Sequence, residues 1–129
     1  MNESIVLIDT NVAIYFLNDT APYAKKVENW IVRDRVAMSV ITVAELLSKS
    51  VQEENQRIDR LLSTSHIEPV DIAIAKTAAS MRRQMLGRKN RIVLIDCLIG
   101  ATAMQRKYVL ATADRKGFPF KELKFAKFR

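Results

Sequence analysis

The sequence predicts an α/β fold, a three-layer α/β/α sandwich around a central, mostly parallel sheet. Short apolar, β-branched segments alternate along the chain with longer stretches of helical periodicity. Strands that alternate with helices indicate a parallel sheet covered on both faces. The chain has 129 residues, of which 49% are hydrophobic and 27% charged, as is usual for one globular domain with a real core. We therefore predict a single domain over residues 1–129.

The N-terminal half is predicted to contain two strands and four helices. The first apolar run is β-branched and reads as a buried strand, after which a helical stretch begins at Asp9. Pro22 suits the first turn of a second helix, whose apolar residues share one face. The predicted elements are a strand at 4–8, helices at 12–17 and 23–32, a strand at 36–39, and helices at 42–50 and 54–62.

The C-terminal half continues the alternation. Asp71 can cap a long helix, and Gly87 can end it. The apolar run at 92–95 has two interpretations, a strand or the buried entry to the next helix. The final residues alternate lysine with apolar side chains, which is typical of an edge strand with its lysines outward. The predicted elements are an extended segment at 67–70, helices at 72–86 and 97–106, and strands at 108–111 and 123–128.

The composition excludes several kinds of chemistry. Cys97 and His66 are the single cysteine and the single histidine, so an internal disulfide and a catalytic histidine pair are impossible. A structural zinc site is excluded too, since it needs about four such ligands. No apolar run reaches the ~18 residues of a membrane helix. The N-terminus lacks the basic region of a signal peptide, and we expect a cytoplasmic protein.

The net charge of +7 is the second bulk property that bears on function. A basic surface suits a polyanion such as a nucleic acid. Each basic cluster taken alone could equally be a solvated helix face. Combined with a group of carboxylates, the basic surface favours a site that attracts phosphate.

Four acidic residues stand where an ordinary core would have none. Asp9 and Asp114 follow predicted strands, Asp96 ends an apolar run, and Glu45 lies inside one. Carboxylates are rarely buried unless they are paired or bind a metal. Ligand sites in parallel α/β sheets form beyond the carboxyl ends of the strands, so these four residues are expected to converge there. Their mutual repulsion would be relieved by a divalent cation that prefers oxygen ligands, Mg²⁺ or Mn²⁺.

Each acid also has a purely structural interpretation. Asp9 and Asp96 precede predicted helices and could be N-caps. The segment from Thr42 to Glu45 matches a capping box, in which the glutamate accepts from the Thr42 amide. Asp114 stands at a turn. Taken singly, capping is favoured for each residue, whereas all four together favour a metal site.

The expected chemistry is hydrolysis of a phosphodiester. A bound cation would polarise the phosphate and supply hydroxide near neutral pH. We expect Asp9 and Asp96 to bind the cation directly, and Glu45 to bind it or to orient the attacking water. Asp114 could bind a second cation. The hydroxyls expected to hold these acids in place are those of Thr10, Ser39 and Thr112.

Four motifs together resemble those of a known family. They are Ile8–Val12, Thr42–Leu46, Ile95–Ala103 and Leu110–Asp114, in the family's order and over nearly the whole chain. The resemblance is to PIN domains, and most closely to the VapC toxins of prokaryotic toxin–antitoxin pairs. It implies Mg²⁺- or Mn²⁺-dependent cleavage of RNA, homodimers, and inhibition by a small antitoxin protein. The residues to which the family's acidic metal site carries over are Asp9, Glu45, Asp96 and Asp114.

The chain departs from the family pattern at the last motif. Members often carry a further aspartate where this chain has Gly117, before Phe118. One outer acid is therefore missing, which bears on the occupancy of a second metal. Cys97 and Gly100 also stand where other small residues are common, and we interpret Cys97 as a small buried residue and not as a nucleophile.

Two other functions are considered. A non-catalytic nucleic-acid-binding module could retain the fold, but it would gain nothing from four carboxylates facing phosphate. A Mg²⁺-dependent phosphatase could use Asp9 as nucleophile, but Asn11 stands where a second aspartate would be expected, and no lysine-bearing motif is obvious. Nucleotide-cofactor binding is disfavoured because the chain has no GxGxxG motif or P-loop.

Overall fold

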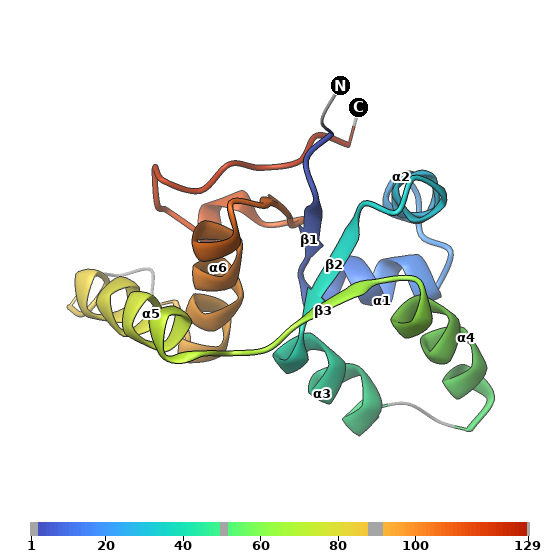
Figure 1. Cartoon of the computed structure of the whole chain (residues 1–129), viewed down its shortest axis with the longest axis horizontal. Coiled ribbons are helices and arrows are strands. Elements are labelled where there is room, and N and C mark those ends of the chain that lie inside the picture. The colour runs from blue at the N-terminus through green and yellow to red at the C-terminus, as the bar shows by residue number, and fades with distance from the viewer. Residues whose placement is uncertain (1–2, 50–51, 88–91, 129) are drawn as a thin grey trace.

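A computed structural model describes residues 3–49, 52–87 and 92–128 of the chain (Figure 1). Its strands form one four-stranded sheet in the order β3-β2-β1-β4, and every neighbouring pair is parallel. The elements are β1 (Val6–Ile8), α1 (Thr10–Leu17), α2 (Tyr23–Val32), β2 (Val36–Ser39), α3 (Val40–Lys49), α4 (Gln52–Ser63), β3 (His66–Glu68), α5 (Ile72–Gln84), α6 (Leu94–Arg106), β4 (Val109–Ala111) and the short 3₁₀ helix η1 (Arg115–Gly117).

The central strand β1 brings distant parts of the chain into register. Val6 pairs with Val36 of β2 on one side and with Val109 of β4 on the other. Because all strands run in the same direction, the residues that follow β1, β2 and β4 meet at one edge of the sheet. Figure 1 shows α3 directly below β2 at this edge and α1 extending to the right from the lower end of β1. We call it the carboxyl edge.

Helices cover both faces of the sheet, which makes the three predicted layers. Leu7 faces a core shared with α5 and α6, whereas Val6 and Ile8 face a core shared with α1, α2 and α4. Successive strand residues point to opposite faces, and here both faces are apolar. Figure 1 places α5 and α6 on one side of the sheet and α1, α2 and α4 on the other. The predicted α/β/α sandwich with a parallel sheet is confirmed.

Three local predictions need correction. The run at 92–95 is the start of α6 at Leu94 and not a strand, and only Ile92 is buried. The next three residues are exposed by 58%, 52% and 43% of their surface, so the entry to this helix is not the buried one expected. The predicted last strand is reduced to a single parallel bridge between Leu110 and Phe125. The predicted helix at 42–50 begins earlier, at Val40, and position 50 lies outside the described residues.

The longest described helices have 13 residues. Within the described ranges, none has the length and apolar character needed to cross a lipid bilayer.

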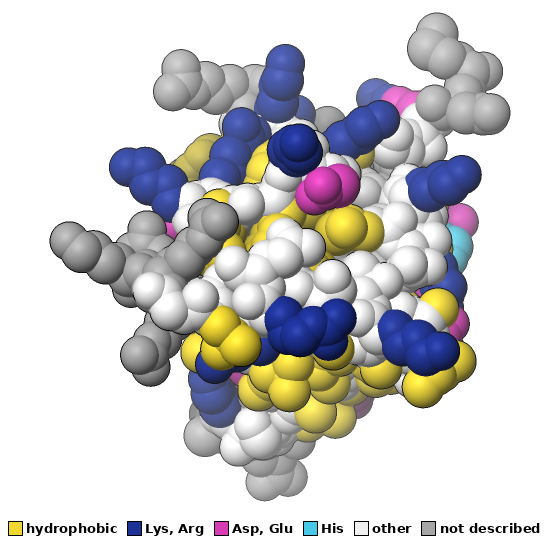
Figure 2. Space-filling model, turned by 90° about the vertical axis from the view of Figure 1, so that its left-hand side faces the viewer, with side chains coloured by type: hydrophobic (Ala, Val, Ile, Leu, Met, Phe, Trp, Pro, Cys, Tyr) yellow, Lys and Arg dark blue, Asp and Glu magenta, His cyan; other side chains and the backbone are white. Residues whose placement is uncertain are grey.

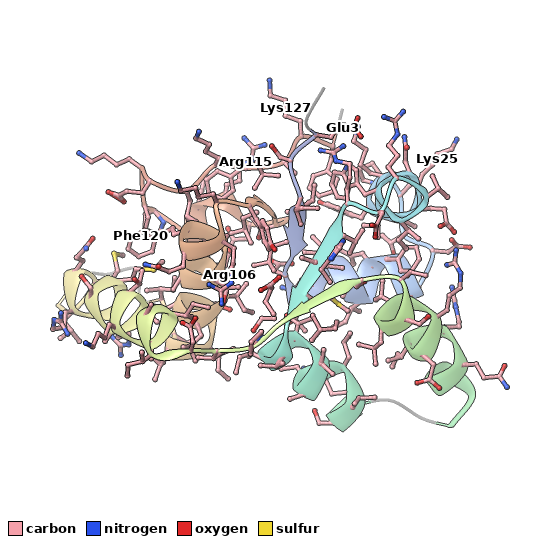
Figure 3. The ribbon with its side chains drawn as sticks, in the orientation of Figure 1. Glu3, Lys25, Arg106, Arg115, Phe120 and Lys127 are labelled. Atoms are coloured by element: carbon pink, nitrogen blue, oxygen red, sulfur yellow. The ribbon has the colours of Figure 1, made fainter. Side chains whose placement is uncertain are left out.

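A polar clamp ties the two helices on one face to the strands. Arg106, at the end of α6, donates to Glu68 at 3.0 Å and to Asp71 at 2.9 Å, and it lies between α6 and β3 (Figure 3). Tyr108 donates its hydroxyl to the second oxygen of Glu68 at 2.7 Å. Burial, with the Glu68 carboxylate second, raises the pKa of Tyr108 to about 12. The clamp therefore connects β3, the start of α5, the end of α6 and the start of β4.

We predict that Tyr108→Phe lowers the free energy of unfolding by about 1 kcal/mol at pH 7, since a hydrogen bond to a carboxylate is lost at a partly exposed site. The raised pKa means that the folded chain holds the phenolic proton more tightly than the unfolded chain. This contribution is complete below pH 10 and is lost as the pH rises toward 12. Chemical denaturation from pH 7 to 12 measures the difference. Tyr15→Phe is the control, because the Tyr15 hydroxyl has no hydrogen bond among the described residues; equal losses in both variants would contradict the role of the clamp.

Candidate active site

Asp9 lies at the junction of β1 and α1 and is 7% exposed. Its Oδ1 accepts a hydrogen bond from the Val12 amide at 2.8 Å, so the residue caps α1 as the structural interpretation expected. Burial raises the pKa of its carboxyl, and the neighbouring Asp114 and Glu45 carboxylates raise it further. Hydrogen bonds from Thr112 and Val12 oppose this rise. The one residue is therefore both a helix cap and a member of an acidic cluster.

Glu45 does not complete a capping box. Helix α3 begins at Val40, three residues before the position the box requires, and the hydroxyl of Ser39 accepts from the amide of Ile41 at 3.0 Å. Glu45 Oε1 instead accepts from the hydroxyl of Thr10, at 2.5 Å. The carboxylate is thus directed across the carboxyl edge toward the start of α1. The structural interpretation of Glu45 is wrong, and Ser39 holds a backbone amide and none of the acids.

Asp96 is the third residue of α6 and not its N-cap, which is Val93 and makes no side-chain hydrogen bond. Its side chain is half-buried in the first turn, where the helix dipole favours a carboxylate. Burial raises the pKa of Asp96, and the carboxylates of Asp9, Glu45 and Asp114 raise it further, in that order. The N-cap interpretation of Asp96 is therefore wrong, whereas its expected closeness to the other three acids is met.

Asp114 follows β4 and is exposed. It caps η1 by accepting from the Gly117 amide at 3.2 Å, and its own amide donates to the Thr112 hydroxyl at 3.1 Å. A Cβ at Gly117 would lie 2.8 Å from Asp114 Oδ2, closer than side chains normally approach. The Asp114 carboxylate therefore occupies the space beside Gly117, the position at which the resemblance led us to expect a further acid.

Three threonines hold the cluster in place. The Thr10 hydroxyl donates to the Glu45 carboxylate. The hydroxyl oxygens of Thr10 and Thr42 are 3.2 Å apart. Thr112 hydrogen-bonds Asp9 and also accepts from the backbone of Asp114. Thr10 and Thr112 were expected in this role, whereas Thr42 was missed. Its position three residues before Glu45, on the same face of α3, was the signal that could have found it.

The four carboxylates share one electrostatic environment, and their charge is not balanced by ion pairs within the described part of the chain. Among the described residues, no Lys or Arg forms an ion pair with any of them. The donor set is all oxygen, from carboxylates and a threonine hydroxyl, which is the chemistry that Mg²⁺ and Mn²⁺ prefer. The residues present therefore fit a divalent cation.

The cluster is not a closed metal cage. Within the parts of the chain that are described, no three His, Cys, Asp or Glu side chains are placed so that they could together hold a metal ion. The carboxylate of Glu45 accepts from the Thr10 hydroxyl, and that of Asp114 accepts from the Gly117 amide. These two carboxylates are therefore held by local hydrogen bonds and not directed at one common point. An open site of this kind suits Mg²⁺, which is usually held by one or two carboxylates together with water and phosphate.

Cys97 follows Asp96 and is fully buried, as expected of a small core residue. Burial raises the pKa of its thiol, so the reactive thiolate is disfavoured.

Fold and site together define an α/β protein with an open acidic site at the carboxyl edge of a parallel sheet. The family model for the PIN domain matches residues 6–126. The chain belongs to the PIN domain family, and the predicted family is confirmed.

Similar proteins support the same assignment. Ribonuclease VapC10 of Mycobacterium tuberculosis is 34% identical over 125 residues, which cover 93% of this chain and 91% of that protein. The chain resembles a solved toxin–antitoxin complex from Klebsiella pneumoniae with a TM-score of 0.77 and 25% identity, over 96% of this chain and 98% of that one. It resembles VapBC2 from Rickettsia felis, bound to a promoter DNA fragment, with a TM-score of 0.80 and 22% identity, over 95% and 97% of the two chains.

We predict that Asp96→Asn raises the unfolding temperature in chelator at pH 7, by about 2–4 °C after allowance for solvent exposure. A raised pKa means that the folded chain binds the proton more tightly than the unfolded chain, so the ionised group destabilises the fold. The penalty is complete once the pH exceeds the folded pKa, and it disappears as the pH falls toward 4. Thermal scans from pH 4 to 8 measure it. Added Mg²⁺ should stabilise the wild type more than this variant.

Asp71→Asn is the matched control, with the opposite sign. The Ile74 amide and Arg106 lower the pKa of Asp71, so its charge stabilises the fold above its ordinary pKa and that contribution is lost as the pH falls through the folded value. This variant should lower the unfolding temperature at pH 7. A lowered temperature for Asp96→Asn as well would show that the acidic cluster is not strained by its own charge.

Proposed function

We propose that this chain is a Mg²⁺- or Mn²⁺-dependent endoribonuclease that hydrolyses RNA phosphodiester bonds in the cytoplasm and acts as the toxin of a type II toxin–antitoxin pair. Residues 1–129 would form a single nuclease domain. The observation that carries the proposal is the cluster of Asp9, Glu45, Asp96 and Asp114, which come from four distant segments and have no cationic partner among the described residues. PIN-domain ribonucleases in general depend on divalent metals, and a relative at 34% identity is named a ribonuclease.

Each residue has a distinct part in the proposed reaction. Asp9 and Asp96 would hold a cation, which when bound would neutralise the clustered charge and polarise the scissile phosphodiester. Asp9 is fixed by its cap to Val12, so its carboxylate is oriented before substrate arrives. Glu45 engages Thr10 through Oε1, and Oε2 is left to hold the cation or to accept a proton from the attacking water. Asp114 is exposed beside the site. It would bind a second cation, or bind the first cation on the side that faces the substrate.

The competing functions make different predictions for these residues. A binding module that lacks catalysis would bind RNA more tightly once a carboxylate is neutralised, because repulsion of phosphate is removed. A phosphatase with Asp9 as nucleophile would hydrolyse a small phosphate ester and leave RNA intact.

We expect purified protein to cleave RNA in Mg²⁺ or Mn²⁺ and to be inactive in chelator. Asp9→Asn and Asp96→Asn should each lower cleavage at least about 100-fold, since each removes a charge that holds the cation. Gel analysis of total RNA measures this, with a chromogenic phosphate ester alongside. Asp59→Asn is the control, because Asp59 is exposed on α4 and makes no ion pair among the described residues. Cleavage that persists in chelator or in both site variants would exclude the metal-nuclease function, and hydrolysis of the ester alone would favour the phosphatase.

A groove between α1, α3 and α4 supports a small antitoxin as partner. It has a volume of about 260 Å³ and is lined by Ile14, Leu17, Leu46, Lys49 and Arg57, among others. An apolar floor with two cations at its rim suits an extended peptide with apolar and acidic side chains. The Klebsiella pneumoniae structure is of a toxin–antitoxin complex, and we propose the same kind of partner here.

A second exposed apolar surface supports a homodimer. Helices α3 and α6 are in contact, and each carries apolar side chains that are at least 38% exposed. These are Val40 and Leu47 of α3 and Leu94 and Ile95 of α6. Two of these residues are sequence neighbours of the acidic cluster, so a dimer built on them would place two active sites near its interface. Exposed apolar surface of this kind marks interaction sites in proteins.

Two matched variants separate the two surfaces. We expect light scattering to show that the wild type is a dimer. Leu94→Glu should be a monomer that still binds the antitoxin, and Leu17→Glu should be a dimer that no longer binds it. The reason in both cases is that a charge is costly to bury at an interface. The antitoxin to be tested is the small protein encoded by the neighbouring gene. A dimer that survives Leu94→Glu, or antitoxin binding that survives Leu17→Glu, would show that the corresponding surface is wrong.

A further inference from the structure

The surface beside Asp114 is hollowed into a space of about 630 Å³. Its wall is formed by Tyr23 at the start of α2, by Asp114, Arg115 and Lys116 after β4, and by Lys127 and Phe128 near the C-terminus. The volume falls in the range of about 300–1,000 Å³ in which proteins bind small ligands. Thr112 also lines this space and hydrogen-bonds Asp9, so the hollow adjoins the acidic cluster.

The hollow is basic although it borders four acids. Among the described residues, Lys116 and Lys127 have no carboxylate partner. Arg115 donates to the carbonyl of Ala126 at 3.0 Å and lies over the ring of Phe125 at 5.3 Å, which fixes its guanidinium. Figure 3 shows Arg115 and Lys127 on the same side of the molecule. Three cations against the single carboxylate of Asp114 give this wall a positive charge suited to phosphate.

The opposite part of the wall is aromatic and held in place. The ring of Phe128 packs edge to face on Tyr23, with 4.8 Å between ring centroids, and its centroid lies 5.7 Å from that of Trp30. The ring of Tyr23 stacks on that of Tyr15, with 4.9 Å between centroids. Tyr23 and Phe128 are both half-buried, so part of each ring remains open to the hollow. Rings fixed in this way bind a planar ligand with little loss of side-chain entropy.

We propose that this hollow is the subsite for one unpaired nucleotide of the substrate RNA, next to the bond that is cleaved. Lys116, Lys127 and Arg115 contact the phosphate, and Tyr23 and Phe128 contact the base. The proposal rests on the proposed ribonuclease function and adds to it the residues that hold one base and its phosphate. A base can reach an aromatic wall only after it has left its helix. Duplex RNA presents stacked bases in a groove that side chains cannot read, whereas single strands bind by stacking on aromatic residues.

The test measures binding separately from cleavage. The full-length Asp96→Asn protein is titrated in Mg²⁺ against a fluorescent 8-nucleotide single-stranded RNA and against the same sequence as a duplex, by anisotropy at several salt concentrations. We expect tighter binding of the single strand. Lys116→Ala with Lys127→Ala should weaken it about 10-fold or more and reduce the salt slope by about 1.4, since each phosphate contact to a single strand contributes about 0.7. Phe128→Leu should weaken it about 5-fold or more through loss of stacking.

The matched control is Lys121→Ala with Lys124→Ala, which removes the same charge from exposed lysines of the same segment outside the hollow. Equal weakening in the control, or equal affinity for duplex and single strand, would overturn the subsite. As a readout independent of the variants' folding, ultraviolet cross-linking of 4-thiouridine RNA should label peptides that contain Tyr23 or Phe128, and labelling confined to other peptides would also overturn it. Wild-type protein that cleaves RNA while the hollow variants bind and cleave normally would leave the nuclease standing and exclude this subsite.

Discussion

The buried carboxylate of Asp9 is the group on which the site depends. It follows the central strand, is 7% exposed, and is bound to the Val12 amide at 2.8 Å. A carboxylate in that position is costly unless its hydrogen bonds are complete and its charge is balanced. The hydrogen bonds from Val12 and Thr112 meet the first requirement, and nothing in the described chain meets the second. The cation that we propose for this site would balance that charge.

Parallel pairing explains how residues so far apart in sequence come to share that charge. Strand β1 lies between β2 and β4, so the segments that follow these three strands all begin at the carboxyl edge. Helix α6 adds Asp96 from its first turn. The threonines then set the distances between segments: Thr10 joins the start of α1 to α3, and Thr112 joins β4 to Asp9. The stiffness of the site comes from short hydrogen bonds between elements and not from any one loop.

The sequence predicted the layers and the closeness of the four acids because both depend on local patterns that tertiary structure preserves, whereas the role of the acids stays a prediction. Continuous apolar runs indicated strands buried on both faces, and an acid after each run indicated the carboxyl edge. The partner of Glu45 could not be predicted, since a capping box and a contact with Thr10 share the same local sequence and only the packing of α1 on α3 decides between them. The exposure of Val93, Leu94 and Ile95 was missed because an apolar run has the same sequence pattern whether it lies in a core or at the surface.

The arrangement of charge is what distinguishes this chain from a simple acidic pocket. Asp114 stands between the other three carboxylates of the cluster and the three cations of the hollow, and Gly117 leaves its carboxylate room to occupy that boundary. The face that carries α5 also bears many Lys and Arg side chains, with hydrophobic ones gathered below a row of them (Figure 2). A polyanion is thus attracted over a wide surface, and the proposed cation would lie in the acidic cluster. Phosphate and cation would then meet beside Asp114, where the two environments join.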